Sequence, residues 1–501
     1  MPIQWGLPFL STNSITMKSR KETFFNGISV QTVITFLMGI MEILVFSVMS
    51  RLLTKTDFGY FAVLTGIMTI CTSITEAGMG AAIIQKKDAS KVFISTAFTL
   101  SWTFGLISTI IVFILAPFLA DCIADKSLTL PLRIMTINIF LACISSVGRS
   151  LMLKKLQFKR VGQYNIIAYF ISSIFGISMA LLGYGLYAIV SISIVNLVIF
   201  NILIYKSGIT FPKWTFSKKD YKQIFSFGGW LTLSVIINNI TQQLDKLLLT
   251  KWLSVTILGA YNRPAGFVAN ITNRINGIFD TVLFPMLSDM QHDLEKTRNI
   301  FIRSIKLLNS CSVVLFAIFF FNAHLIITIF FGTEWIELVP ILQIISISVI
   351  FSIDNRLVDC YFRSLNLVYL GFKLRVFSAI LTLVCIIIGT KYALYGVAYG
   401  LLIANLGTVF LKVYFLANYL SIRFIDFLKS CVIAFKPLIP LMFVGGIFLT
   451  CEFAVWKDVV FACVFAILVI IEFLFFPNMV GSEYKETIYP TIKGKLIKRS
   501  K

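Results

Sequence analysis

Charged residues are scarce in this chain. Asp, Glu, Lys and Arg make up 13% of its 501 residues, and 58% are hydrophobic. An average soluble domain has about 25% charged residues. This scarcity excludes a soluble globular protein, and the 48 Phe residues suit helices surrounded by lipid. We therefore expect an all-α, polytopic membrane protein.

Residues that bind metals or carry catalysis are also few. The two His residues, His292 and His324, lie far apart, and the nine Cys residues show no metal-ligand spacing. We expect no disulfides, because most Cys residues fall inside apolar runs, where Cys behaves as a small hydrophobe. The sequence has no nucleotide-binding glycine loop, no HExxH and no GxSxG in a plausible setting. We expect neither an enzyme nor a bound cofactor.

Acidic residues are outnumbered by basic ones, 23 to 44, which gives a net charge of +21. A nucleic-acid partner does not follow, because the bases occupy short segments between apolar runs, as the positive-inside rule describes. With the N-terminus inside, the cytoplasmic segments hold Lys86, Lys87, Lys91, Arg149, Lys154, Lys155, Lys159, Arg160, Lys206, Lys213, Lys218, Lys219, Lys222, Lys296, Arg298, Arg303, Lys306, Arg356, Arg363, Lys373, Arg375, Lys412, Arg423, Lys429 and Lys436, with a further basic tail.

Long apolar runs predict fourteen spanning helices, since a span needs about 20 mostly apolar residues. Both termini are then cytoplasmic. The spans are 26–50, 58–82, 92–119, 129–152, 162–183, 185–205, 226–250, 258–287, 301–331, 336–360, 370–390, 392–415, 432–451 and 456–477. The long span 301–331 is expected to begin with an interfacial turn, and Gly183 and Gly185 predict a tight turn between two spans. Residues 1–16 carry no charge, and we expect Met17 to be the true start or 1–16 to be interfacial or disordered.

The chain also shows a faint internal repeat. A shift of 200 residues places Arg51 on Lys251, Gly59 on Gly259 and Glu42 on Gln242. It predicts two lobes related by an axis along the membrane normal. The expected domains are a cytoplasmic segment (1–25), an N-lobe (26–205), a basic cytoplasmic linker (206–225), a C-lobe (226–415), two further spans (416–477) and a basic cytoplasmic tail (478–501).

Polar residues lie on single faces of two predicted C-lobe helices. Asn238, Gln242 and Asp245 are spaced i, i+4, i+7, and Asn270 and Arg274 share the face of the next span. A charge near the bilayer centre costs about 2.5–3.5 kcal/mol on insertion scales, so these faces should meet protein or water. The two interpretations are a water-filled transport cavity and hydrogen bonds that hold neighbouring helices together.

The N-lobe has similar faces. Glu42 and Glu76 are the acids within the first two spans, and Arg149 lies at the end of the fourth. A buried carboxylate needs a partner, water or a proton to exchange. Structural ion pairing is the alternative for each of the two acids.

Several segments, taken in order, resemble one family. They are RLLTKTDFGYFAVL (51–64), TEAGMGAAIIQKKD (75–88), RSLMLKKLQFKR (149–160), LDKLLLTKWLSVTILGAY (244–261) and FPMLSDMQ (284–291). The chain is similar to bacterial polysaccharide exporters, the Wzx-type flippases of lipid-linked oligosaccharides in the multidrug/oligosaccharidyl-lipid/polysaccharide (MOP) superfamily. The likeness is greatest to the colanic-acid and teichuronic-acid exporter branch.

The resemblance implies two six-helix lobes around a central cavity, with two additional C-terminal helices, in the bacterial plasma membrane. It implies alternating-access transport of undecaprenyl-pyrophosphate-linked oligosaccharide, with membrane lipids, a polysaccharide polymerase and glycosyltransferases as partners. The bases expected to approach the anionic substrate are Arg149, Lys246, Arg263 and Arg274. The alternatives are a multidrug or cation antiporter of the same superfamily and a non-transporting scaffold of polysaccharide assembly.

Overall fold

The structure is a computed structural model that describes residues 17–76, 79–85, 90–123, 126–155, 157–207, 254–278 and 293–434. It also describes isolated residues within 214–243, 283–290 and 436–469. The predicted spans 226–250, 432–451 and 456–477, and residues 1–16, therefore lie wholly or mostly outside the described residues. Every described element is helical, which confirms the predicted all-α class.

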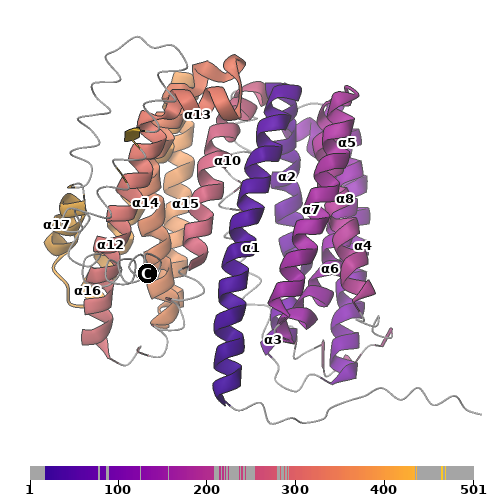
Figure 1. Ribbon diagram of the computed structural model, residues 1–501, viewed down its shortest axis with the longest axis horizontal. Helices are drawn as coiled ribbons and strands as arrows, with labels where there is room; N and C mark the ends of the chain where they lie inside the picture. Colours follow the sequence, from indigo (N-terminus) through magenta and orange to yellow (C-terminus); the bar gives the residue numbers. More distant parts are fainter. Residues whose placement is uncertain are drawn as a thin grey trace, which may run out of the picture.

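The first half of the chain forms one helical bundle, drawn in indigo to magenta in Figure 1. Its helices are α1 (Met17–Leu52), α2 (Lys55–Glu76), α3 (Met79–Gln85), α4 (Lys91–Ile123), α5 (Thr129–Met135), α6 (Ile137–Lys154), α7 (Phe158–Leu181) and α8 (Leu186–Lys206). A short 3₁₀ helix, η1 (Lys126–Leu128), precedes α5. The tight turn between α7 and α8 is confirmed, because Gly183 and Gly185 have φ values of +84° and +50°, which glycine adopts readily.

The second half forms a second bundle beside the first (Figure 1). Its helices are α10 (Val255–Ile278), α12 (Leu294–Phe321), α13 (Ala323–Phe330), α14 (Val339–Ser364), α15 (Val368–Gly389), α16 (Ala393–Tyr419) and α17 (Phe424–Ala434), with the 3₁₀ helices η3 (Thr333–Leu338) and η4 (Thr390–Tyr392). Within the described part of the chain, nine helical segments are long and apolar enough to cross a membrane.

One predicted span differs from the observed helices, and another contains a junction of two helices. Span 129–152 is made of α5 and α6, which meet at Thr136, whose Oγ1 donates to the Arg133 carbonyl. The long span 301–331 already begins at Leu294, because the Asp293 side chain accepts from the Lys296 amide and caps the helix. That span is interrupted at Asn322. Hydropathy alone does not locate such caps and breaks.

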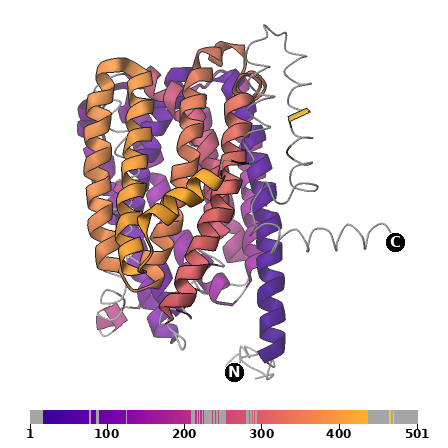
Figure 2. The same cartoon turned by 90° about the vertical axis from the view of Figure 1, so that its left-hand side faces the viewer.

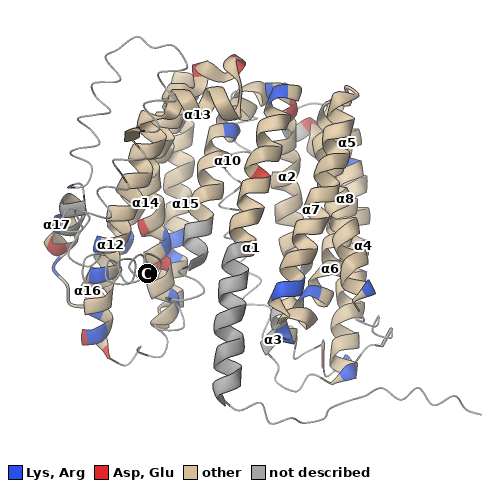
Figure 3. Cartoon of the chain, in the orientation of Figure 1, with Lys and Arg blue, Asp and Glu red and all other residues tan. Residues whose placement is uncertain are grey.

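The two bundles together have two ends that differ in charge. We call the end with Arg51, α13 and η3 the Arg51 end, and the end with α3 the Lys154 end. At the Lys154 end, Lys154 Nζ donates to the Ile83 carbonyl at 3.1 Å. Figure 3 shows Lys and Arg, in blue, concentrated in the half of the bundle that contains α3.

The two bundles meet most closely where α2 crosses α10 near the Arg51 end. A Cβ added at Gly59 would lie 1.9 Å from the Val255 carbonyl oxygen, and one added at Gly259 would lie 1.8 Å from the Lys55 carbonyl oxygen. The contact is therefore backbone against backbone. It is also reciprocal under the shift of 200 residues that the sequence suggested, and the hydroxyls of Thr56 and Thr256 lie 3.1 Å apart across it.

A methyl group at this crossing is expected to push α2 and α10 apart. Gly59→Ala should lower the stability of the purified protein by about 1–3 kcal/mol, the usual cost of overpacking. The matched control is Gly266→Ala on the same helix pair, because an added Cβ there meets nothing within 4 Å. Thermal unfolding in detergent measures both variants. Equal midpoints for the two would contradict the close contact.

Candidate functional site

Polar contacts join the two bundles at the Arg51 end. Lys55 Nζ of α2 lies 2.6 Å from Glu337 Oε1 of η3. Arg51 Nη2 of α1 donates to the Ile329 carbonyl of α13 at 2.8 Å. The indole Nε1 of Trp335 donates to a backbone carbonyl of α1 at 3.3 Å. These contacts connect α1 and α2 to η3 and α13, so both bundles contribute to one closed interface.

Arg263 lies within this interface rather than at a surface. It belongs to α10, its exposed fraction is 6%, and its guanidinium carbon lies 3.7 Å from the ring centroid of Phe46 and 3.1 Å from that of Phe58. One guanidinium nitrogen donates to Ser50 Oγ at 2.8 Å. A cation between two aromatic faces is held by their quadrupoles. Arg263 thus links α10 to both α1 and α2.

Aromatic side chains fill the space around Arg263. Trp335 is almost fully buried, and its ring lies 6.1 Å from that of Phe58 and 6.2 Å from that of Phe331. Phe331 also contacts Phe46 edge-on, with the ring centroids 5.1 Å apart. Packed aromatic rings of this kind exclude water. We call this interface the Arg51-end seal. It is formed by α1, α2, α10, α13 and η3.

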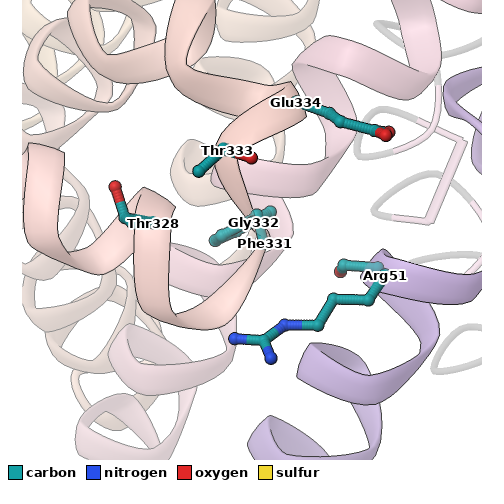
Figure 4. Close-up of a pocket in the computed structure, with 7 residues that line it drawn as sticks. Arg51, Thr328, Phe331, Gly332, Thr333 and Glu334 are labelled. Atoms are coloured by element: carbon teal, nitrogen blue, oxygen red, sulfur yellow. The ribbon is translucent and has the colours of Figure 1, made fainter.

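A polar cavity of about 310 Å³ lies within the seal, between α1 and the α13–η3 turn (Figure 4). Its walls come from the end of α1 and from the α13–η3 turn, where Gly332 adopts a φ of +100°. The lining residues are Ser50, Arg51, Thr328, Phe331, Gly332, Thr333 and Glu334. In Figure 4 the Arg51 side chain extends towards the α13–η3 turn. Polar side chains therefore line the part of the interface that the aromatic rings do not fill.

The family described as "polysaccharide biosynthesis protein" matches residues 48–340, more than half of the chain. The chain belongs to this family. Among its relatives is the lipopolysaccharide biosynthesis protein WzxC of Escherichia coli K12, 24% identical over 75% of this chain and 77% of its own. Another is the teichuronic acid biosynthesis protein TuaB of Bacillus subtilis 168, 24% identical over 66% and 69%. These findings confirm the resemblance found in the sequence.

Solved structures share the fold of this polysaccharide biosynthesis protein. The lipid II flippase MurJ in an inward closed conformation superposes with a TM-score of 0.69 at 15% identity, covering 90% of this chain and 99% of its own. An inward-facing multidrug transporter of the MATE family, within the MOP superfamily, gives a TM-score of 0.59 at 13% identity, covering 78% and 98%. At sequence identities of 15% and 13%, the similarity shows that the fold is shared.

The residues that the sequence nominated for the site fall into four groups. Glu42 is half-buried on α1, and the side chains of Arg149 on α6 and Asn270 on α10 are exposed. Arg263 lies in the seal. The structure places Glu76 on α2 and Arg274 on α10 but does not describe their side chains, and the remaining four lie outside the described residues: Asn238, Gln242, Asp245 and Lys246. Their role as cavity residues stays a prediction.

Asn239 is next in sequence to Asn238 and has a contact that the structure describes. Asn239 Nδ2 donates to Ser73 Oγ of α2 at 2.5 Å. An amide of the predicted span 226–250 therefore hydrogen-bonds a helix of the first bundle. This bond is the type of contact that the helix-to-helix interpretation of the polar faces describes.

Buried charges of α14 and α16 form a group that the sequence did not predict. Lys412 is 5% exposed, and its Nζ lies 2.8 Å from Asp359 Oδ1, while an Arg375 nitrogen lies 3.8 Å from the other carboxylate oxygen. The charge pattern alone places Lys412 and Arg375 among the cytoplasmic bases. The available signal was Asp359 inside an apolar span, because an acid there requires a partner.

Replacement of Arg263 tests its part in the seal. Arg263→Met keeps the length of the side chain but removes the charge, the stacking between Phe46 and Phe58 and the bond to Ser50. We expect a loss of about 1–3 kcal/mol, since each cation–π contact is worth about 0.5–2 kcal/mol when desolvated. Thermal unfolding measures it, with Arg149→Met, an exposed position, as the control. A midpoint unchanged by Arg263→Met would show that the guanidinium contributes nothing to the interface.

Proposed function

We propose that this protein is a transporter that carries undecaprenyl-pyrophosphate-linked oligosaccharide from the inner to the outer leaflet of a bacterial plasma membrane by alternating access. The glycosyltransferases that build the substrate act before it, and a polysaccharide polymerase acts after it. Membership of the polysaccharide biosynthesis protein family supports this proposal. So do relatives named for lipopolysaccharide and teichuronic acid biosynthesis and the fold shared with a lipid II flippase.

The charge distribution supports one orientation. Lys and Arg are concentrated towards the Lys154 end (Figure 3), and basic loops stay in the cytoplasm. In the proposal the Lys154 end and both termini are cytoplasmic, and the Arg51 end faces outward. The lobes are the predicted ones, 26–205 and 226–415, joined by the cytoplasmic linker 206–225.

The Arg51-end seal is the observation that carries the mechanism. Backbone contact at Gly59 and Gly259, the enclosed Arg263 and the Lys55–Glu337 ion pair close the outward end between the lobes. A substrate held between the lobes can then leave outward only after these contacts separate. We propose that this arrangement is the inward-facing state, and that α2 and α10 part when the protein turns outward.

The substrate chemistry fits the predicted cavity residues. A pyrophosphate is recognised best by guanidinium groups, whose planar fork donates two parallel hydrogen bonds. We propose that Arg149 and Arg274 meet the pyrophosphate and that Asn270 and the other polar residues meet the glycan, while the polyprenyl tail stays in lipid. Arg263 joins them only when the lobes separate, because its guanidinium is enclosed by Phe46 and Phe58 in this state.

Transport in reconstituted vesicles tests the substrate class. We expect the purified protein to make a labelled undecaprenyl-pyrophosphate-linked oligosaccharide accessible to a lectin on the opposite face of the vesicle. Vesicles without protein give the background. Export of a cationic dye without movement of the glycan lipid would assign the protein to the drug-antiporter alternative and overturn the proposal.

Crosslinking of the seal tests the mechanism. The hydroxyl oxygens of Thr56 and Thr256 lie 3.1 Å apart, so the double variant Thr56→Cys/Thr256→Cys is placed to form a disulfide. Oxidation should stop transport and a reductant should restore it, because the lobes can no longer part. Each single variant is the control for effects of the oxidant on native Cys residues. A double variant that is crosslinked, as mass spectrometry shows, yet transports at the parental rate would contradict alternating access at this end.

A further inference from the structure

A second cavity lies in the first bundle, away from its interface with the second. It has a volume of about 490 Å³, and its walls come from α4, α6 and α8. Figure 1 shows α4 and α8 on the side of the first bundle that faces away from the second bundle. Figure 2, viewed from the side of the second bundle, has the second bundle in front of the first. The cavity therefore lies outside the space between the lobes, where the proposed function holds the transported substrate.

The cavity is level with the cytoplasmic border of the hydrocarbon layer in the proposed orientation. Helix α8 runs for 21 residues from Leu186 to Lys206, which is about 31 Å at 1.5 Å per residue. Trp102 lies about 31 Å from the end of α4 at Ile123 on the same scale. The hydrocarbon core of a bilayer is about 30 Å thick. Trp102 and Lys206 therefore stand at the level where Trp and Lys side chains meet lipid headgroups.

Two polar atoms of the cavity wall lack a hydrogen-bond partner among the residues that the structure describes. They are Nε1 of Trp102 and Oδ1 of Asn201, and both atoms are buried. Asn201 is 8% exposed, and its Nδ2 donates to the carbonyls of Leu141 and Leu197 at 3.0 and 2.9 Å. Those two bonds fix the orientation of the amide, so Oδ1 remains as an acceptor. Unpaired buried polar atoms are unfavourable, so a guest that offers both an acceptor and a donor completes the cavity.

The rest of the wall is mostly apolar and opens towards lipid. Ile202 lines the cavity and is 47% exposed. Leu106 and Ile110 follow Trp102 on α4 at helical steps of four residues, and they are 46% and 50% exposed. Exposed apolar side chains at this depth contact acyl chains. The cavity is therefore continuous with a lipid-facing surface, and its guest enters from the bilayer.

Lys206 supplies a positive charge to the cavity wall, where it is exposed. The linker that Lys206 begins is basic throughout its length. It also contains Lys213, Lys218, Lys219 and Lys222, with Asp220 as its acid. Basic pockets between spanning helices on the cytoplasmic side favour anionic lipid headgroups. The charge therefore selects a guest with a net negative headgroup.

The linker is held against α4 beside this cavity. The indole ring of Trp214 packs edge-on against that of Trp102, with the ring centroids 5.4 Å apart. The Thr99 hydroxyl donates to the Thr215 carbonyl at 3.3 Å. Trp214 is 62% exposed, as is usual for an aromatic side chain with one face on protein and one towards a membrane interface. The basic linker and the cavity therefore lie at the same level of the bilayer.

We propose that this cavity binds a hydroxylated anionic phospholipid of the cytoplasmic leaflet, of the phosphatidylglycerol class, by its headgroup. The phosphate lies at Lys206, and one of its oxygens accepts from Trp102 Nε1. A glycerol hydroxyl donates to Asn201 Oδ1, and the acyl chains follow the exposed face of α4. A phosphodiester alone has no donor for Asn201, and a zwitterionic headgroup has no net charge for Lys206. The site does not depend on the transported substrate.

Native mass spectrometry of the full-length protein, delipidated in detergent, tests the proposal with four lipids of identical acyl chains. Phosphatidylglycerol has the charge and the hydroxyls, and phosphatidylethanol has the charge without a hydroxyl. Phosphatidylethanolamine has a donor without net charge, and phosphatidylcholine has neither. We expect phosphatidylethanol to bind about threefold to tenfold more weakly than phosphatidylglycerol, the effect of one hydrogen bond. The two zwitterionic lipids should bind at least about fivefold more weakly, the effect of one Lys near the headgroups.

Two variants assign the binding to this cavity. Lys206→Gln should weaken the binding of phosphatidylglycerol about fivefold and leave that of phosphatidylcholine unchanged. Lys159→Gln is the matched control, because it removes the same charge from an exposed position at the Lys154 end, and it should bind as the parent does. Trp102→Phe keeps an aromatic ring but removes the N–H donor, so it should weaken the binding of both anionic lipids about threefold to tenfold.

Three results overturn the proposal. If the four lipids bind equally, or if phosphatidylethanol binds as tightly as phosphatidylglycerol, the cavity does not recognise the headgroup. If Lys206→Gln weakens binding no more than Lys159→Gln does, the attraction belongs to the basic end as a whole. If Trp102→Phe binds phosphatidylglycerol as the parent does, the lipid lies elsewhere.

Discussion

The backbone contact of α2 with α10 is the constraint on which the arrangement of the two bundles depends. Helices approach this closely only where side chains are absent, and Gly59 and Gly259 provide that on opposite sides of one crossing. The close crossing positions Phe58 of α2 against Arg263 of α10, and it brings Lys55 to Glu337. The contact is reciprocal under a shift of 200 residues, because Gly59 meets the Val255 carbonyl and Gly259 meets the Lys55 carbonyl.

Charges inside the bundle are accommodated in three different ways. Arg263 is held by two aromatic rings and a hydroxyl, and Lys412 is held by Asp359. Asp354, among the residues that the structure describes, is met by the side-chain amide of Asn309. Because unpaired charge is costly in apolar surroundings, the first two contacts favour one fixed arrangement.

The sequence predicted the fold class, the positions of most described spans, the Gly183–Gly185 turn and the family. Apolar length and the alternation of basic segments are local properties, so they can be read without a structure. The repeat was visible in Gly59 and Gly259, but their mutual contact was not. Arg263 was expected near the substrate, whereas in this state Phe46 and Phe58 enclose it. The pairing of Lys412 with Asp359, 53 residues apart, needs tertiary structure, and hydropathy cannot locate the break at Asn322.

The central claim is that the lobes separate at the Arg51 end during transport. Distances between spin labels measure this directly, with one pair at Lys126 and Lys391 on the Arg51 end and another at Lys155 and Arg363 on the Lys154 end, each pair spanning both lobes. In vesicles supplied with the glycan lipid, we expect a second, longer distance for the first pair and a second, shorter one for the other. A single unchanged distance at each end, in protein that transports, would contradict the account.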